Sequence, residues 1–281
     1  MAVTNFISEV WSKKLQKIFD THAVFRNIVN TNFEGDIKDA GDKVKIRTYG
    51  DITINDYTRG ATLSFQTLTD PMDTLNIDQL KYFSFLVDDL DKVQSNIDLL
   101  TGYSERAAIA IRNVIDKALH AQAYGGIKSA NVIGASGSPI NLSKDNIFQY
   151  VAQMSELMDA SNTPGEDRHL VIAPWVKTRL LRSPEFIRSS EMGDKTVMNG
   201  YIGEYLGFRV HVSTNLNTVS GATPIVALTR DLVTFASQVA KVEAVDPPDM
   251  FAKGIKGLYL YGSKVVQKSN GCGAVLWAVA A

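Results

Sequence analysis

The sequence lacks several features that mark particular classes of protein. Its one cysteine, Cys272, excludes an internal disulfide framework and fits a reducing compartment. No apolar run approaches the roughly 20 residues that are needed to span a bilayer. The first residues also lack the basic and apolar regions of a signal peptide. We therefore expect an intracellular, soluble chain with no membrane partner.

The sequence has no excess of charge of either sign. Its 281 residues include 29 basic and 30 acidic residues, which give a formal net charge of −1 and a pI near 6.4. A protein that holds nucleic acid mainly by electrostatics is usually strongly basic, so that role is disfavoured. Hydrophobic residues make up 45% of the chain, which is enough for a folded protein with a sizeable core.

Motifs for catalysis or cofactor binding are also missing. Residues 257–264 carry the glycines of a phosphate-binding loop, but serine and lysine stand in the wrong order. Cys272 has no histidine near it in sequence, and we interpret it as a buried or idle thiol. Four histidines are scattered without metal-ligand spacing, although folding could bring them together: His22, His120, His169 and His211. We expect no catalytic site, no cofactor and no metal.

A long hairpin is the most distinctive predicted feature. Residues 51–57 and 61–68 alternate polar and apolar positions around a break at Thr58-Arg59-Gly60, after a first alternating strand at 43–47. Threonines are frequent there, so these strands have little apolar surface to bury, and an isolated two-stranded ribbon is marginal in water. The ribbon should therefore lie on something else. We favour a neighbouring subunit, although hairpins more commonly lie on their own domain.

The hairpin has an acidic bias. Between Arg47 and Lys81 there is one basic residue, Arg59, and there are five aspartates, at positions 51, 56, 70, 73 and 78. The commoner explanation is a solvated face. The alternative is charge complementarity with a neighbouring subunit, which sets register more than affinity.

Helical patterns flank the hairpin on both sides. Residues 4–20 carry apolar side chains at intervals of three and four, and the pattern is then lost through Asn32. That helix either packs on its own core or forms an arm on a neighbouring subunit. A strand over 77–88 precedes a helix over 97–123, which is long for a globular protein.

Beyond a loop rich in Gly, Ser and Pro at 125–139, the sequence predicts alternating helices and strands. Predicted helices cover 144–159, a segment from Pro174 to Ser183, and 231–237. Predicted strands cover 169–173, the end of 200–213, 224–228, and the chain from Lys241 onward. Asn270-Gly271 predicts a turn that joins two strands as a hairpin.

The order of these elements resembles the major capsid proteins of tailed bacteriophages, whose subunits share the Hong Kong 97-type fold. Three segments are similar to patterns of that family and occur in the same order: His169-Leu-Val-Ile-Ala-Pro174, Ser183-Pro-Glu-Phe186 and Gly203-Glu-Tyr-Leu-Gly-Phe-Arg-Val-His-Val-Ser213. The resemblance implies an α+β fold with an N-terminal arm, an extended β-hairpin loop, a peripheral domain with a long spine helix, and an axial domain.

The resemblance also assigns boundaries. It implies an N-terminal arm at 1–35, a peripheral domain at 36–140 and 246–281, and an axial domain at 141–245. Within the peripheral domain, the extended hairpin loop would cover 47–76 and the spine helix 97–123.

The function implied by this resemblance is structural and not enzymatic. The chain would be a major capsid protein that assembles with itself, through pentamers and hexamers, into an icosahedral shell around a phage genome. Double-stranded DNA would be enclosed without sequence-specific contacts, and a separate scaffolding protein and a portal would be further partners. The protein would assemble in the host cytoplasm and reside in the virion. Subunit contacts are expected at Trp11, Asp56, Tyr57, Arg59 and Phe65.

Two departures from the family and two alternatives remain at this point. Residues 48–80 contain no lysine, so the loop lacks the residue that some members crosslink to an asparagine. The sequence starts at the arm and not with a scaffold segment, which is why a separate scaffolding protein is implied. An encapsulin-type nanocompartment would use the same fold to enclose a protein cargo. A cytoplasmic α/β enzyme would need convergent catalytic groups.

Overall fold

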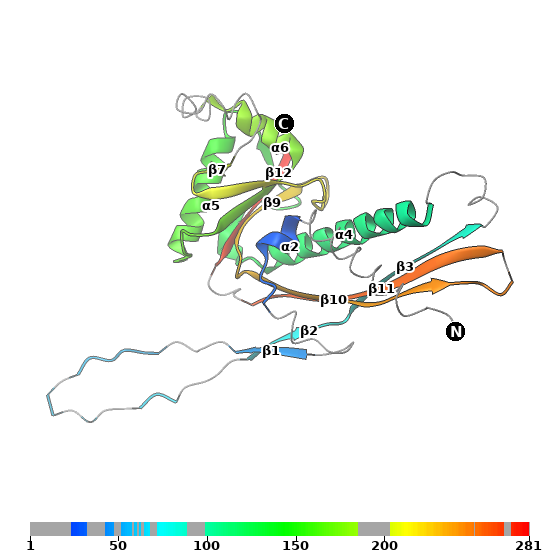
Figure 1. The fold of residues 1–281 in the computed structure, drawn as a ribbon. Coiled ribbons are helices and arrows are strands. Elements are labelled where there is room, and N and C mark those ends of the chain that lie inside the picture. The colour runs from blue at the N-terminus through cyan, green and yellow to red at the C-terminus, as the bar shows by residue number, and fades with distance from the viewer. Residues whose placement is uncertain are drawn as a thin grey trace.

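The computed structural model describes residues 24–32, 43–47, 52–57, 59–60, 62, 65–67, 72–88, 99–184, 203–249, 251–266 and 271–280. They form three sheets, of two, three and seven strands, with a long helix and an extended loop that projects from the body (Figure 1). The predicted helix at 4–20 and the expected contact residue Trp11 lie outside the described residues. Within the described ranges, no helix has both the length and the apolar character that crossing a bilayer requires.

A three-stranded antiparallel sheet and helix α4 (Leu99–Gly126) form the elongated part of the molecule (Figure 1). The strands are β10 (Val233–Val245), β11 (Ala252–Val265) and β3 (Gln79–Asp88), in that order. Because successive strand residues point to opposite faces, Phe83 and Tyr259 face the core beside α4. The strand predicted at 77–88 and the helix predicted at 97–123 are both confirmed, with ends shifted by two or three residues.

A seven-stranded mixed sheet forms the compact part. Its main path runs β4-β12-β9-β6-β8-β7, and β5 also pairs with β12. The strands are β4 (Val132–Ile133), β5 (Ile140–Leu142), β6 (Arg168–Ile172), β7 (Glu204–Tyr205), β8 (Phe208–Val212), β9 (Thr223–Thr229) and β12 (Gly273–Ala280). One face packs against α5 (Ile147–Ala160) and α6 (Pro174–Leu181), and a short 3-10 turn, η2 (Ser129–Asn131), precedes β4. These two helices and strands β6 and β9 agree with the sequence prediction.

Helix α4 connects the two sheets. Its apolar residues recur at intervals of three and four, at positions 108, 111, 115, 119 and 123, and all are buried. They share one core with Tyr259 and Tyr261 of β11 and with Val226 and Val275 of the larger sheet. The short helix α2 (Val24–Ile28) completes this core with Phe25, which is fully buried. The sequence pattern missed α2 because five residues are too few for a periodic signal.

Two predictions for the C-terminal part are wrong. Residues 231–237 do not form a helix; the chain makes a turn at Arg230 and enters β10 at Val233. The turn at Gly271 does not join a hairpin, because β11 and β12 belong to different sheets. In both cases the pairing of the next strand was set by the tertiary structure, which a local pattern does not contain.

The predicted hairpin is paired only at its base. Strand β1 (Lys43–Arg47) pairs with β2 (Met72–Asn76), with Lys43 opposite Asn76 and Arg47 opposite Met72. The described residues of 52–57 and 65–67 are not in strands, so the prediction of strands at 51–57 and 61–68 is wrong for them. These described residues extend without a β-ladder. We call residues 48–71 the extended loop.

A row of hydrogen bonds fixes α4 to the loop that follows β8. Asn215 Nδ2 donates to Asn113 Oδ1 (3.0 Å) and to Asp116 Oδ2 (3.3 Å). The Asn217 backbone N–H donates to His120 Nδ1 (2.9 Å). His120 Nε2 lies 2.9 Å from the Pro224 carbonyl oxygen and donates to it, because its other nitrogen already accepts. Both ring nitrogens of His120 are therefore satisfied only in the neutral imidazole.

This histidine makes subunit stability depend on pH. Burial lowers the pKa of His120 to about 4, from an ordinary value of 6.5, so the unfolded chain binds a proton that the folded chain refuses. The contribution of neutral His120 to the free energy of unfolding is therefore fully present above pH 6.5. It is lost as the pH falls toward 4. We expect it to be at most about 3 kcal/mol.

Urea unfolding of unassembled subunits at pH 7, 5.5 and 4.5 tests this expectation. His120→Gln should flatten the pH dependence, and the comparison with the unsubstituted chain isolates this histidine, because the pKa of His169 is also lowered and that of Asp116 raised. Identical pH dependence in the two proteins would contradict the assignment.

Gly262 of β11 lets the junction between β2 and β3 pass close to this strand. A Cβ added there would collide with the carbonyl oxygen of Asn76, at the junction between β2 and β3. We expect Gly262→Ala to lower the free energy of unfolding by about 1–3 kcal/mol, because rigid backbone must move. Gly165→Ala is the matched control, since its added Cβ meets open space. Equal urea midpoints for the two variants would show that the crossing is not tight.

Candidate subunit interface

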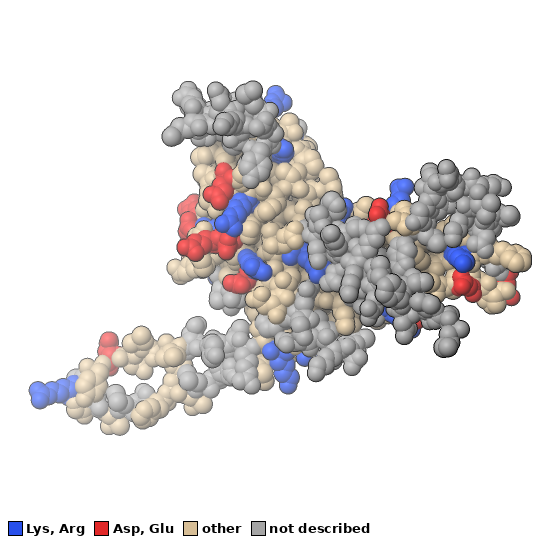
Figure 2. Space-filling view, in the orientation of Figure 1, with Lys and Arg blue, Asp and Glu red and all other residues tan. Residues whose placement is uncertain are grey.

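The described residues of the extended loop project from the body and do not pack on it. All of its described residues are exposed (Figure 2). Ile54 and Phe65 are each 93% exposed, which is unusual for large apolar side chains. Ile52 and Tyr57 are also largely exposed. A projecting segment with this much apolar surface fits a role in contacting another molecule.

Hydrogen bonds join described residues within the loop. The Thr53 backbone N–H donates to Gln66 Oε1 (2.9 Å) across the two limbs, and the Gly60 N–H donates to Tyr57 Oη (3.4 Å) near the tip. These contacts hold the limbs near each other without the regular pairing of a ribbon. The large apolar side chains among the described loop residues stay exposed.

The base of the loop is firmly held. Val44, Ile46 and Leu75 of the β1–β2 pair are buried against Ala236 and Leu260 of the three-stranded sheet. Lys264 Nζ also pairs with Asp73 Oδ1 at 2.8 Å, with both side chains partly buried. The loop is thus a long projection on a fixed support.

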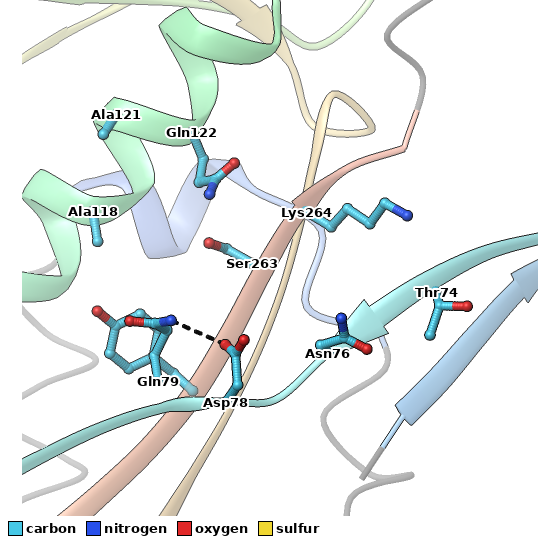
Figure 3. Close-up of a pocket in the computed structure, with 10 residues that line it drawn as sticks. Thr74, Asn76, Asp78, Gln79, Ala118, Ala121, Gln122, Ser263 and Lys264 are labelled. Atoms are coloured by element: carbon cyan, nitrogen blue, oxygen red, sulfur yellow. Dashed lines mark hydrogen bonds between the residues drawn. The ribbon is translucent and has the colours of Figure 1, made fainter. Parts of the chain in front are cut away.

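A polar cavity of about 470 Å³ lies beside this base (Figure 3). Gln122 approaches it from α4, Ser263 from β11 and Asp78 from the junction between β2 and β3. Gln79 Nε2 donates to Asp78 Oδ1 at 3.0 Å. The remaining lining residues are Thr74, Asn76, Ala118, Ala121, Tyr261 and Lys264. None of the described residues that line the cavity is a histidine or cysteine, and its amides and hydroxyls suit hydrogen bonding to a polar partner.

The three-stranded sheet exposes apolar side chains on the face opposite α4, which we call the outer face. Tyr82 is 80% exposed, Leu80 53% and Leu86 52%, all on β3, and Leu258 of β11 lies directly opposite Tyr82 in the antiparallel register. Beside them, Lys241 and Lys256 both form ion pairs with Glu243. A shallow groove of about 490 Å³ runs between these charged residues and Tyr82. Sequence analysis missed this surface, although the alternation along β3 was visible.

Among the described residues on the face drawn in Figure 2, charges do not gather into a large area of one sign. On the side drawn in Figure 2, positive and negative side chains are mixed over the body. Arg209, for example, pairs with Asp167 Oδ1 at 2.6 Å and with Glu204 Oε1 at 3.5 Å. This mixing agrees with the near-zero net charge.

Folding brings two of the four histidines together. His169 Nδ1 of β6 lies 3.0 Å from His211 Nε2 of β8. The two neutral rings therefore form one hydrogen bond, in which one nitrogen donates and the other accepts. Burial, the other histidine and Arg209 lower the pKa of His169 to about 4. Among the described residues, no group of three or more His, Cys, Asp and Glu side chains is arranged to hold a metal ion. His120 belongs to a different set of hydrogen bonds, with Asn217 and Pro224. His22 lies outside the described residues.

Cys272 is buried, as expected for an idle thiol. Burial raises the pKa of its thiol, which keeps it protonated and unreactive at neutral pH.

The structure places four of the five expected contact residues on the extended loop. Asp56, Tyr57, Arg59 and Phe65 are all exposed there, and their contact with a neighbouring subunit stays a prediction. None of the described loop residues packs on the body of its own subunit.

Comparisons with known proteins agree with this geometry. The family described as phage capsid protein matches residues 71–273. A structure from Mycobacterium phage Che8 is similar with a TM-score of 0.77 and 29% identity, over 91% of each chain. The capsid of cyanophage P-SCSP1u has a TM-score of 0.74 and 16% identity, over 92% of this chain and 89% of that one. The mature capsid of bacteriophage PhiM1 has a TM-score of 0.71 and 14% identity, over 92% and 87%.

A comparison with curated proteins finds no match. The structural likenesses confirm the expected α+β fold of the Hong Kong 97 type.

Proposed function

Since the chain belongs to the phage capsid protein family and is a shell-forming capsid protein, we propose that its copies assemble through pentamers and hexamers into an icosahedral shell around a phage genome. The extended loop and the N-terminal arm tie each subunit to the next. Rings of five and rings of six can both be built from the same kind of subunit, because each contact is made head to tail. Together such rings can close into a shell.

The extended loop is the observation that carries this proposal. Its large apolar side chains, with Ile54 and Phe65 each 93% exposed, are not buried by the described part of their own chain. Leaving such groups in water costs about 1.5–3 kcal/mol for each one that could be buried. A neighbouring subunit is the partner that every copy of a shell protein has, and its contact with Asp56, Tyr57, Arg59 and Phe65 would bury them.

The enclosed genome is held by containment in this proposal. A net charge of −1 gives each subunit little overall attraction for DNA, and it also keeps many closely packed copies from repelling one another. A scaffolding protein and a portal are the further partners that we propose for assembly in the host cytoplasm. The role is architectural and involves no catalytic step.

We predict that replacing residues 51–68 with a short Gly/Ser turn leaves a folded subunit that does not form shells. The free energy of unfolding should change little, because the described residues removed are all exposed. Light scattering and negative-stain microscopy measure assembly, and urea unfolding measures the fold.

Tyr103→Ser, a change at an exposed position on α4, is the control and should assemble normally. Shells of normal size and yield from the loop-deleted chain would overturn the role of the loop.

A further inference from the structure

We propose that His169 and His211 form a binding site for one divalent transition-metal ion of the nickel or copper class. The two imidazoles are the protein ligands, and water completes the coordination. This site departs from the expectation of no metal that the scattered histidines gave in sequence. It has two protein ligands, whereas groups of three or more are absent among the described residues.

The seven-stranded sheet places both imidazoles on one face. Strands β6 and β8 are parallel, with His169 opposite Arg209 and His211 opposite Val171. Alternate residues of a strand point to the same side, so the two histidines lie on the same face, two positions apart on neighbouring strands. Both stand within strands and not in loops, so the ladder of backbone hydrogen bonds holds the two ligands close together before an ion binds.

The separation of the two facing nitrogens suits a shared ion. His169 Nδ1 and His211 Nε2 lie 3.0 Å apart. Metal–nitrogen bonds of roughly 2.0–2.1 Å that meet at a right angle place their nitrogens about 3 Å apart, whereas a tetrahedral angle places them about 3.3 Å apart or more. Right angles between neighbouring ligands are typical of Cu²⁺ and Ni²⁺, and imidazole is a preferred ligand of both ions.

The described part of the chain gives these two rings no other hydrogen-bond partner. His120 differs, because both of its ring nitrogens contact the backbone and its role in the fold is thereby complete. In the histidine pair, a small rotation of each ring turns both lone pairs toward an ion. The hydrogen that the rings share then moves to the other nitrogen of its own ring, so both ligands stay neutral imidazoles.

One ligand is buried and the other reaches the surface. His169 is 9% exposed, and His211 is more exposed than that, although it is still partly buried. An ion can therefore enter beside His211, where water has access to its remaining coordination positions.

The charged side chains near the pair balance one another. Arg209 pairs with Asp167 and with Glu204, and Arg230 is a second cation close enough to influence His169. These four side chains carry two positive and two negative charges. A divalent cation thus meets no net positive charge from them.

A bridging ion would fasten one side of the sheet. Strand β8 pairs with β6 from Arg209 to Val212, and on its other side it has only the two-residue strand β7. Two coordinate bonds between β6 and β8 add a connection that crosses the ladder. Because the unfolded chain does not hold the two imidazoles together, the ion binds the folded chain more tightly and stabilises it.

Isothermal titration calorimetry of the untagged full chain with NiCl₂ tests the inference. We expect one ion per chain, and we expect His169→Gln and His211→Gln each to weaken binding by about tenfold or more, because one imidazole is left. Nickel at about 100 times its dissociation constant should also raise the Tm of the unsubstituted chain by roughly 5 °C. Neither substituted chain should show this shift at the same nickel concentration.

His22→Gln and His120→Gln are the matched controls, because each removes one of the other two histidines and keeps the pair. Both should bind nickel as the unsubstituted chain does. Circular dichroism checks that each variant is folded, and His211→Gln carries the test if the buried position 169 does not tolerate substitution. Absence of binding to the unsubstituted chain, or unchanged affinity in His211→Gln, would overturn the site.

Discussion

The burial of one side of α4 is the constraint on which the rest of the structure depends. Ile111, Ile115 and Leu119 lie in a core shared by the three-stranded sheet, the seven-stranded sheet and α2. Because one rigid helix contacts all of them, the elongated and compact parts have a defined relative position. The hydrogen bonds of His120 to Pro224 and of Asn215 to Asp116 add polar contacts between α4 and the compact part.

A fixed body makes a projecting loop useful. The β1–β2 base is held by burial of Leu75 and by the pair of Lys264 with Asp73, so the loop starts from a defined point and direction. Among the described residues, the exposed apolar side chains of the loop make no packing contact that stabilises their own subunit. Stability and the proposed assembly therefore depend on different residues. The buried core stabilises the subunit, and we propose that the loop contributes to contacts between copies.

The family relationship and the surface chemistry support the same architecture. A shell protein needs mixed surface charge, complementary head-to-tail surfaces and a rigid frame between them. Lys241, Glu243 and Lys256 border an apolar outer face on one side of the sheet, and the acidic extended loop leaves the other end. The frame between these surfaces is β11, which contributes to the core, to the loop base and to the outer face.

The sequence alone determined the long periodic elements, because their signals are local. The spacing of apolar residues located α4, a strand pattern located β3, and a short apolar run located β6. Tertiary structure decided what local signals cannot contain. A threonine-rich alternating run is a strand only if a partner pairs with it, so residues 52–57 extend unpaired, whereas 233–237 become strand by pairing with β11. The approach of His169 to His211 and the exposure of Tyr82 likewise depend on which strands lie side by side and on what covers each face.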